Sequence, residues 1–155
     1  MAAIGVAVPR LGIRLDGWRY PLAVGALSRV FSMAVLAAVG LVRGDGALAP
    51  FGGWDGIWYQ RIADYGYDPT VAHGNGVAFS PLYPLLVRLV GNAAGWSYLV
   101  AGVVVSTAAF LVAIVLLHRL IARRTGEPIA RTAVWLTAFF PVAYLFSSVY
   151  TESVF

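Results

Sequence analysis

Long apolar runs alternate with short polar stretches along this chain, and the lengths of the runs predict helices that cross a membrane. Two runs, residues 21–42 and 98–117, each have about the 20 residues that a helix needs to span a bilayer. A third run, residues 132–155, contains Pro141, where a kink is expected. Because the chain ends inside this run, we expect it to be the N-terminal part of a longer polytopic protein.

The first run is predicted to be a membrane span, and a cleaved signal peptide is the alternative. Its apolar core exceeds the about 7 to 15 residues of a typical signal peptide, and it follows a long leader, residues 1–20. One face of the expected helix is polar, since Gly25, Ser28, Arg29 and Ser32 recur at helical spacing. An arginine near the centre of a bilayer costs about 3 kcal/mol, so Arg29 should face other helices and find a partner there.

The charges of the connecting segments predict how the spans are oriented. The leader and residues 118–131 carry an excess of arginine, which is typical of cytoplasmic segments, whereas residues 43–97 form the predicted outer loop and begin with an acidic stretch. An odd number of crossings must then separate the two loops. The short apolar stretch 79–90 is therefore predicted to be a re-entrant or interfacial helix that starts near Pro81 or Pro84, and two short spans are the alternative.

The composition indicates an all-α integral membrane protein with about three spans in this chain. Hydrophobic residues make up 60% of it and charged residues 12%, about half of the share that is usual in soluble domains. There is no cysteine, and His73 and His118 lie far apart in sequence, so no metal site is expected. The net charge is +4, but the eleven cationic residues are all Arg and flank the apolar runs, so nucleic acid is not an expected partner.

Residues 54–67 are an island of aromatic and ionisable residues within the predicted outer loop. Large side chains recur there at helical spacing, at Trp54, Trp58, Ile62 and Tyr65. This spacing predicts an amphipathic helix that lies in the membrane interface with its aromatic rings at headgroup level. Gly66 is the expected end of the helix.

Three charged residues are candidates for chemistry at the outer face, and each has a plain structural alternative. Asp55 opens the predicted interfacial helix between two tryptophans, where its carboxylate can accept a hydroxyl proton or simply cap the helix. Glu152, which lies among hydroxyl side chains, either lines a hydrogen-bonding pocket or ends a span at the interface. Arg88 either binds a phosphate or extends to lipid headgroups.

Three motifs occur in a fixed order along the chain. They are Trp54-Asp55 leading through Ile62-Ala63 to Gly66-Tyr67; Ala78 to Pro84, which reads Ala-Phe-Ser-Pro-Leu-Tyr-Pro; and Pro141 followed by residues 147–155, which read Ser-Ser-Val-Tyr-Thr-Glu-Ser-Val-Phe. Together with Arg29 in the first span, this ordered set resembles the PIG-V family of glycosylphosphatidylinositol mannosyltransferases and their bacterial relatives. That family belongs to the GT-C class of polytopic glycosyltransferases. One departure is Ser80, where the family usually has an aromatic residue.

The resemblance implies transfer of mannose from a polyprenyl-phosphate donor to a lipid-linked or cell-surface glycan at the non-cytoplasmic face of the membrane. It implies that Asp55 is the general base, and no metal or other cofactor is expected if cationic side chains neutralise the leaving phosphate. Substrate and donor binding is expected, on the same grounds, at Trp54, Trp58, Tyr83, Arg88, Tyr150, Glu152 and Arg29. Arg29 lies closer to the middle of the membrane than to its outer face, so a structural role is its alternative. The Arg-, Ala- and Gly-rich composition indicates a bacterial plasma membrane, whereas eukaryotic relatives would act in the endoplasmic reticulum.

Two other classes of function stay open at this level. A membrane transporter would account for a charged Arg29 inside a span and for the interrupted apolar segment 79–90. A non-catalytic membrane subunit would only present its outer loop to a partner. Donor-dependent sugar transfer by the full-length protein would count against both.

Overall fold

Two long helices dominate the computed structural model, which describes residues 15–68, 70, 79–152 and 154. They are α1, Arg19–Arg43, and α4, Tyr98–Thr125, and both are long and apolar enough to cross a membrane. Helices are the only regular secondary structure among the described residues. The predictions made for residues 1–14, His73, Ala78, Ser153 and Phe155 fall outside them.

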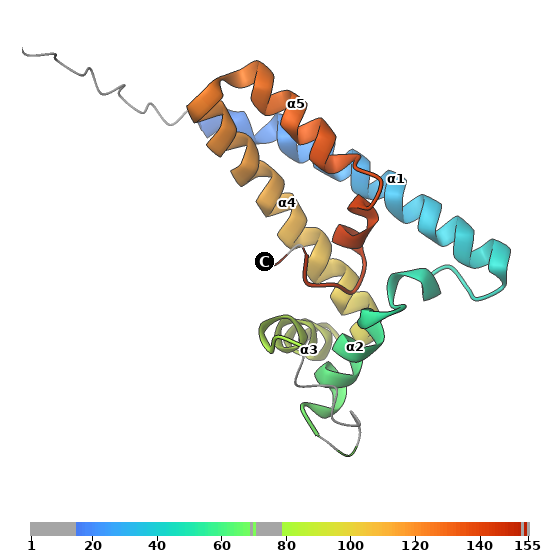
Figure 1. The fold of residues 1–155 in the computed structure, drawn as a ribbon. Coiled ribbons are helices and arrows are strands. Elements are labelled where there is room, and N and C mark those ends of the chain that lie inside the picture. Colours follow the sequence, from blue (N-terminus) through green and yellow to red (C-terminus); the bar gives the residue numbers. More distant parts are fainter. Residues whose placement is uncertain (1–14, 69, 71–78, 153, 155) are drawn as a thin grey trace, which may run out of the picture.

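The other elements are short. They are η1 (Leu15–Trp18), η2 (Ala49–Phe51), α2 (Asp55–Tyr65), α3 (Leu82–Ala94), α5 (Glu127–Ala138) and η4 (Ala143–Ser147). The start of α1 and the end of α4 lie together where α5 begins, and the two long helices diverge toward the other end (Figure 1). At that other end α2 and α3 pack beside the first turns of α4, and α3 is seen end-on, so it runs across α4 (Figure 1).

The first two predicted spans correspond to α1 and α4. On α1 the expected polar face is turned inward: Gly25, Ser28 and Arg29 are buried and Ser32 is half-buried. Glycine at position 25 permits a close approach of the two helices, since a Cβ there would lie 3.1 Å from the side chain of Ile114 on α4. Close approach through small residues is how helices pack in membranes, where lipid competes with any larger apolar side chain.

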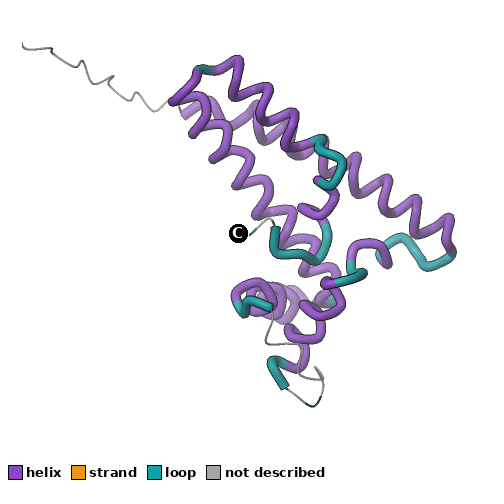
Figure 2. Tube along the Cα trace, in the orientation of Figure 1, coloured by secondary structure: helices purple, strands orange, loops and turns teal. Residues whose placement is uncertain are grey.

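The predicted third span, residues 132–155, is wrong as a single helix. The helix α5 ends at Ala138, and after a break the chain forms only the single 3-10 turn η4, as the interruption in Figure 2 shows. Pro141 explains the break, since a proline removes a backbone donor and pushes the preceding residue away from helical geometry. A helix of 12 residues is too short to span a bilayer, so the described residues contain two candidate spans and not three.

The predicted cytoplasmic loop, residues 118–131, is also mostly helical. The helix α4 continues through its basic residues to Thr125, and Gly126, with φ of 96°, makes the turn into α5. Charge therefore did not mark the end of the helix; the glycine did, because it adopts a backbone conformation that other residues avoid. Glu127 follows the turn and accepts hydrogen bonds from Arg131, at 3.0 Å, and His118, at 3.3 Å.

The short apolar stretch at 79–90 forms α3, a helix of 13 residues that begins after Pro81, close to the predicted start. Gly95, the residue after its last turn, has a left-handed backbone and closes the helix. Its length supports the prediction that this segment does not cross a membrane by itself.

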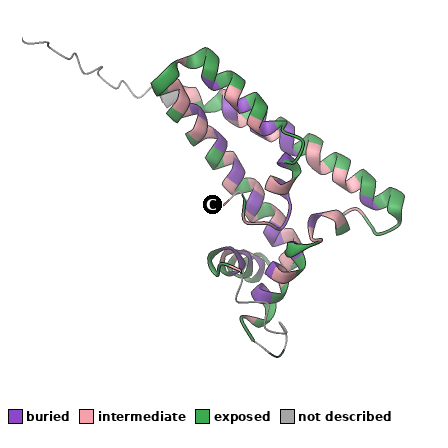
Figure 3. Ribbon diagram, viewed as in Figure 1, coloured by how far each residue is buried: buried purple, intermediate pink, exposed green. Residues whose placement is uncertain are grey.

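The interior is divided into two apolar clusters. One joins α1, α4 and α5 and contains Val24, Phe110, Ile114, Val134 and Ala138. The other joins α2, α3, α4 and the segment after η4, and contains Tyr59, Ala63, Tyr83, Val87, Ala101 and Val149. Figure 3 shows that much of the outward surface of the two long helices is exposed, and many of the exposed residues there are large and apolar. Such faces suit contact with lipid or with further helices.

Candidate functional site

The turn before α2 holds Asp55 in an unusual way. Trp54, the residue before it, has a φ of 53°, the only positive value outside glycine in the described chain. A bulky residue in this region is strained by about 1 to 3 kcal/mol and persists only when its surroundings hold it. The turn is closed by hydrogen bonds from Gly56 N to Gly53 O, at 2.9 Å, and from Ile57 N to Trp54 O, at 3.2 Å.

The Asp55 carboxylate does not cap its helix. Helix α2 begins at Asp55 itself, and no side chain caps its first turn within the described residues. The structural alternative for Asp55, a helix cap, is therefore wrong. The carboxylate is exposed at the positive end of the helix, where a negative charge is favoured.

The segment after η4 packs directly against this turn. Val149 N donates to Phe51 O at 2.8 Å, and the Val149 side chain is fully buried between α2 and α4. Two glycines make room for it. A Cβ at Gly56 would lie 3.2 Å from Val149 O, and one at Gly102 would lie 2.9 Å from both Val149 methyl groups. The segment after η4 therefore lies in the core beside Phe51, which is nearly 100 positions earlier in the chain.

This contact brings two tyrosines and two carboxylates together. Tyr150 Oη donates to Gly53 O at 3.2 Å, and Tyr59 Oη shares a hydrogen bond with Thr151 Oγ1 at 3.2 Å. Burial raises the pKa of Tyr150 to about 12, and the negative charges of Asp55 and Glu152 add to the rise. Burial likewise raises the pKa of Tyr59, with the same two carboxylates contributing. Both phenols therefore stay protonated at neutral pH, and the Tyr150 O–H donates to Gly53 O beside Asp55.

A buried chain of hydroxyl groups on α3 and α4 binds the backbone of the segment after η4. Tyr83, which is fully buried, shares a hydrogen bond of 2.8 Å with Ser106, and Ser106 Oγ donates to Tyr150 O at 3.1 Å. Burial also raises the pKa of Tyr83 well above its usual range. Tyr83 was expected to bind substrate, but its phenol faces this network and has no exposed surface. Its contribution is to hold the backbone at Tyr150.

Arg29 lies away from this cluster. It is 2% exposed, and its guanidinium donates to Ala138 O at 3.0 Å, to Ala143 O and to Ser147 Oγ at 3.2 Å. These partners lie at the end of α5 and along η4. The observed contacts fit the structural role that was the alternative for Arg29.

The remaining expected site residues lie at the surface around α2 and α3. Trp54 is 88% exposed beside Asp55, and Glu152 is exposed on the segment opposite. Trp58 is half-buried and stacks on Phe79 with 6.3 Å between ring centroids. Arg88 is exposed on α3, and no contact joins it to the other site residues among those that the structure describes.

The aromatic stripe and the buried face of α2 share only one residue. In the stripe predicted to lie at headgroup level, Trp54 and Tyr65 are exposed and Trp58 is half-buried, while Ile62 is buried. The buried face runs instead through Gly56, Tyr59, Ile62 and Ala63 and packs on α3. Gly66 ends the helix as predicted, with its N–H bonded to Ile62 O at 2.9 Å.

Sequence reasoning missed Tyr59 and Ser106, which hold the site together. Tyr59 lies one position from the predicted aromatic stripe, and Ser106 lies inside an apolar run where a lone serine carries no signal. Gly56 and Gly102 were the available sign that another segment packs closely here. Glycine inside a helix costs about 1 kcal/mol, so its presence usually indicates that a larger side chain would not fit.

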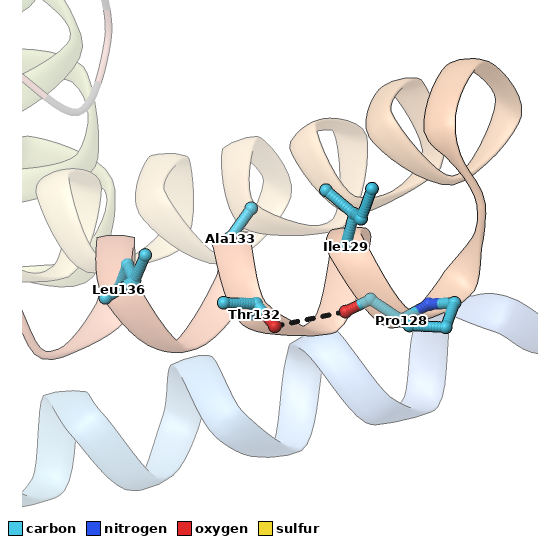
Figure 4. Close-up of a pocket in the computed structure, with 5 residues that line it drawn as sticks. All are labelled: Pro128, Ile129, Thr132, Ala133 and Leu136. Carbon is cyan, nitrogen blue, oxygen red and sulfur yellow. Dashed lines mark hydrogen bonds between the residues drawn. The ribbon is translucent and has the colours of Figure 1, made fainter.

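One pocket lies apart from this cluster, on the exposed surface of α5. It has a volume of about 330 Å³ and is lined by Pro128, Ile129, Thr132, Ala133 and Leu136 (Figure 4). All five residues belong to one helix, and the Thr132 hydroxyl is already bonded to Pro128 O at 3.2 Å. With no ionisable group in its lining, the pocket is not a candidate for catalysis.

A search for related proteins found no matching family model, no similar curated protein and no similar solved structure.

Proposed function

We propose that the protein is a glycosyltransferase of GT-C type that uses a polyprenyl-phosphate-mannose donor, with Asp55 as the general base. The observation that carries the proposal is the exposed Asp55 carboxylate, which does not cap its helix and is flanked by Trp54 and Tyr150. The ordered resemblance to the PIG-V family supports the sugar and the donor. On this proposal the acceptor is a lipid-linked or surface glycan, and the reaction occurs on the non-cytoplasmic side of the bacterial plasma membrane.

The proposed reaction is a single inverting displacement. A hydroxyl oxygen of the acceptor attacks the anomeric carbon of mannose and forms the new glycosidic bond, while the bond from that carbon to the phosphate oxygen breaks. The acceptor proton passes to Asp55, and polyprenyl phosphate leaves with the bonding electron pair. Exposed Trp54 offers a flat apolar face for a sugar ring, and exposed Arg88 is the remaining candidate for neutralising the phosphate.

The competing functions draw less support from the geometry. A transporter was suggested by a charged residue within a span, but Arg29 is used to bind backbone carbonyls at the end of α5. A non-catalytic subunit needs no strained turn before an exposed carboxylate, since strain of this kind is concentrated at functional sites. These two functions are the alternatives that the following experiment separates from catalysis.

The test is the variant Asp55→Asn in the full-length protein. Membranes that contain it are supplied with radiolabelled polyprenyl-phosphate mannose, and incorporation into endogenous lipid and glycan is measured. Removing a general base lowers the rate by about 10² to 10⁴-fold, while membrane insertion should be unchanged. Asp64→Asn is the matched control, because Asp64 is an exposed carboxylate on the same helix. Equal transfer by the parent protein and Asp55→Asn would exclude Asp55 as the base, and no transfer by the parent would count against the proposed function.

A further inference from the structure

We infer that Tyr150 is a positioning residue for Asp55: its phenol holds the Gly53 carbonyl and thereby fixes the strained turn at Trp54 that presents the carboxylate. The inference rests on the proposed role of Asp55. It assigns Tyr150 a task different from substrate binding, which the sequence led us to expect.

The first step of the argument is that the Asp55 carboxylate has no side-chain support of its own. No hydrogen bond or ion pair of the carboxylate occurs within the described residues. Its direction is therefore set by the backbone of residues 53–55. That backbone is strained at Trp54, whose φ of 53° must be maintained by contacts from elsewhere.

The second step is that Tyr150 binds the turn directly before Trp54. Its phenol donates to Gly53 O at 3.2 Å. The only other side chain bonded to this turn among the described residues is Gln60, which donates to Gly52 O and Gly56 O at 3.3 and 2.9 Å. Gln60 holds the flanks of the turn, so Tyr150 is the one described side chain that reinforces the backbone hydrogen bonds at its centre, from Gly56 N to Gly53 O and from Ile57 N to Trp54 O.

The third step is that Tyr150 is itself firmly held. Its carbonyl accepts from Ser106 on α4, and the neighbouring Val149 N donates to Phe51 O at 2.8 Å. The Val149 side chain is clamped between Gly56 and Gly102. A phenol on such a fixed backbone can constrain a turn, whereas a phenol that mainly recognised a mobile substrate would be expected to keep a free donor.

The test is Tyr150→Phe in the full-length protein, with Tyr144→Phe as the matched control. Tyr144 lies six residues earlier, in η4, is 40% exposed, and its phenol makes no hydrogen bond within the described residues. Two measurements are made. The first is kcat and KM for radiolabelled polyprenyl-phosphate mannose. The second is the mobility of a nitroxide on Ile57→Cys, an exposed position two residues after Asp55. Residues 1–155 contain no cysteine, and every cysteine elsewhere in the full-length protein is first replaced by serine, so the label has one target.

For Tyr150→Phe we expect kcat to fall by about 10 to 100-fold with KM changed by less than about twofold, because small displacements of a reacting group carry costs of this size. The nitroxide should become more mobile, and Tyr144→Phe should change neither quantity. A raised KM with unchanged kcat would show that Tyr150 binds substrate and would overturn the inference, as would an unchanged nitroxide spectrum. If the parent protein transfers no mannose, the proposed function fails, but the nitroxide measurement still decides whether Tyr150 holds the turn.

Discussion

Arg29 shows how one residue compensates for a break in a neighbouring helix. Because α5 ends at Ala138, its last carbonyls lose their partners within the helix, and in an apolar interior each must be satisfied from elsewhere. Arg29 supplies donors to Ala138 O and, across the break, to Ala143 O, while its charge lies 4.2 Å from the centre of the Phe110 ring. A guanidinium suits this task because its donors form a planar fork and its charge stacks well on aromatic faces.

The variant Arg29→Met should lower the stability of the protein. It leaves the buried Ala138 carbonyl without the donor that Arg29 supplies, and an unpaired buried acceptor costs about 1 to 3 kcal/mol. Arg29→Lys should lie between the parent and Arg29→Met, since an ammonium group can serve some of the same acceptors. Thermal unfolding in detergent measures the effect. Arg43→Met, on an exposed arginine at the end of the same helix, is the control and should stay close to the parent. An Arg29→Met protein as stable as that control would contradict this role.

At the scale of elements, hydropathy correctly predicted the helices that can be recognised by the length of an apolar run. The helices α1 and α4 were found within a few residues at their starts, and α3 was correctly separated from them by its shortness. The third run was wrongly predicted as one helix because hydropathy does not report on the backbone. Most residues from 132 to 146 are apolar, but Pro141 ends the helix that precedes it.

The candidate site was predictable only in part for a related reason. Asp55 and Glu152 were identifiable as isolated charges among aromatic and hydroxyl residues. The bonds that join their segments link residues 92 and 97 positions apart, from Tyr59 to Thr151 and from Gly53 to Tyr150. Contacts between residues so far apart in sequence form because both segments pack around Val149. No local sequence pattern predicts that packing.

Gly102→Ala tests this packing. The added methyl group would lie 2.9 Å from both methyl groups of Val149, so the segment after η4 must shift. Overpacking of this kind costs about 1 to 3 kcal/mol. Val149→Ala should be destabilising alone but should relieve Gly102→Ala, so the double variant is more stable than the sum of the two losses predicts. Gly17→Ala is the control, because a Cβ there meets nothing within 4 Å. Strict additivity in thermal unfolding would mean that the two residues are not in contact.

At the scale of the whole molecule, a group of arginines and the candidate site lie toward opposite ends of α4. Arg19, Arg123, Arg124 and Arg131 lie at the end where α1 begins and α4 ends (Figure 1). The turn at Asp55 and the segment 147–152 lie toward the other end, where α4 begins. Exposed apolar faces lie between the two ends. We propose a membrane orientation in which the arginines are cytoplasmic.

The orientation predicts a specific labelling pattern. Residues 1–155 contain no cysteine, so in a full-length protein whose other cysteines are replaced by serine, Asp45→Cys, Asn92→Cys and Arg124→Cys each give a single exposed target. A maleimide that cannot cross membranes should label positions 45 and 92 in intact cells, and position 124 only after the membrane is opened. Position 92 lies near the end of α3, so its labelling distinguishes a re-entrant or interfacial α3 from an α3 that crosses the membrane. If α3 crosses the membrane, 45 and 92 will fall on opposite sides. If 45 and 124 react alike in intact cells, α1 and α4 do not form an antiparallel pair of spans, and Asp55 loses the location on which the proposed reaction depends.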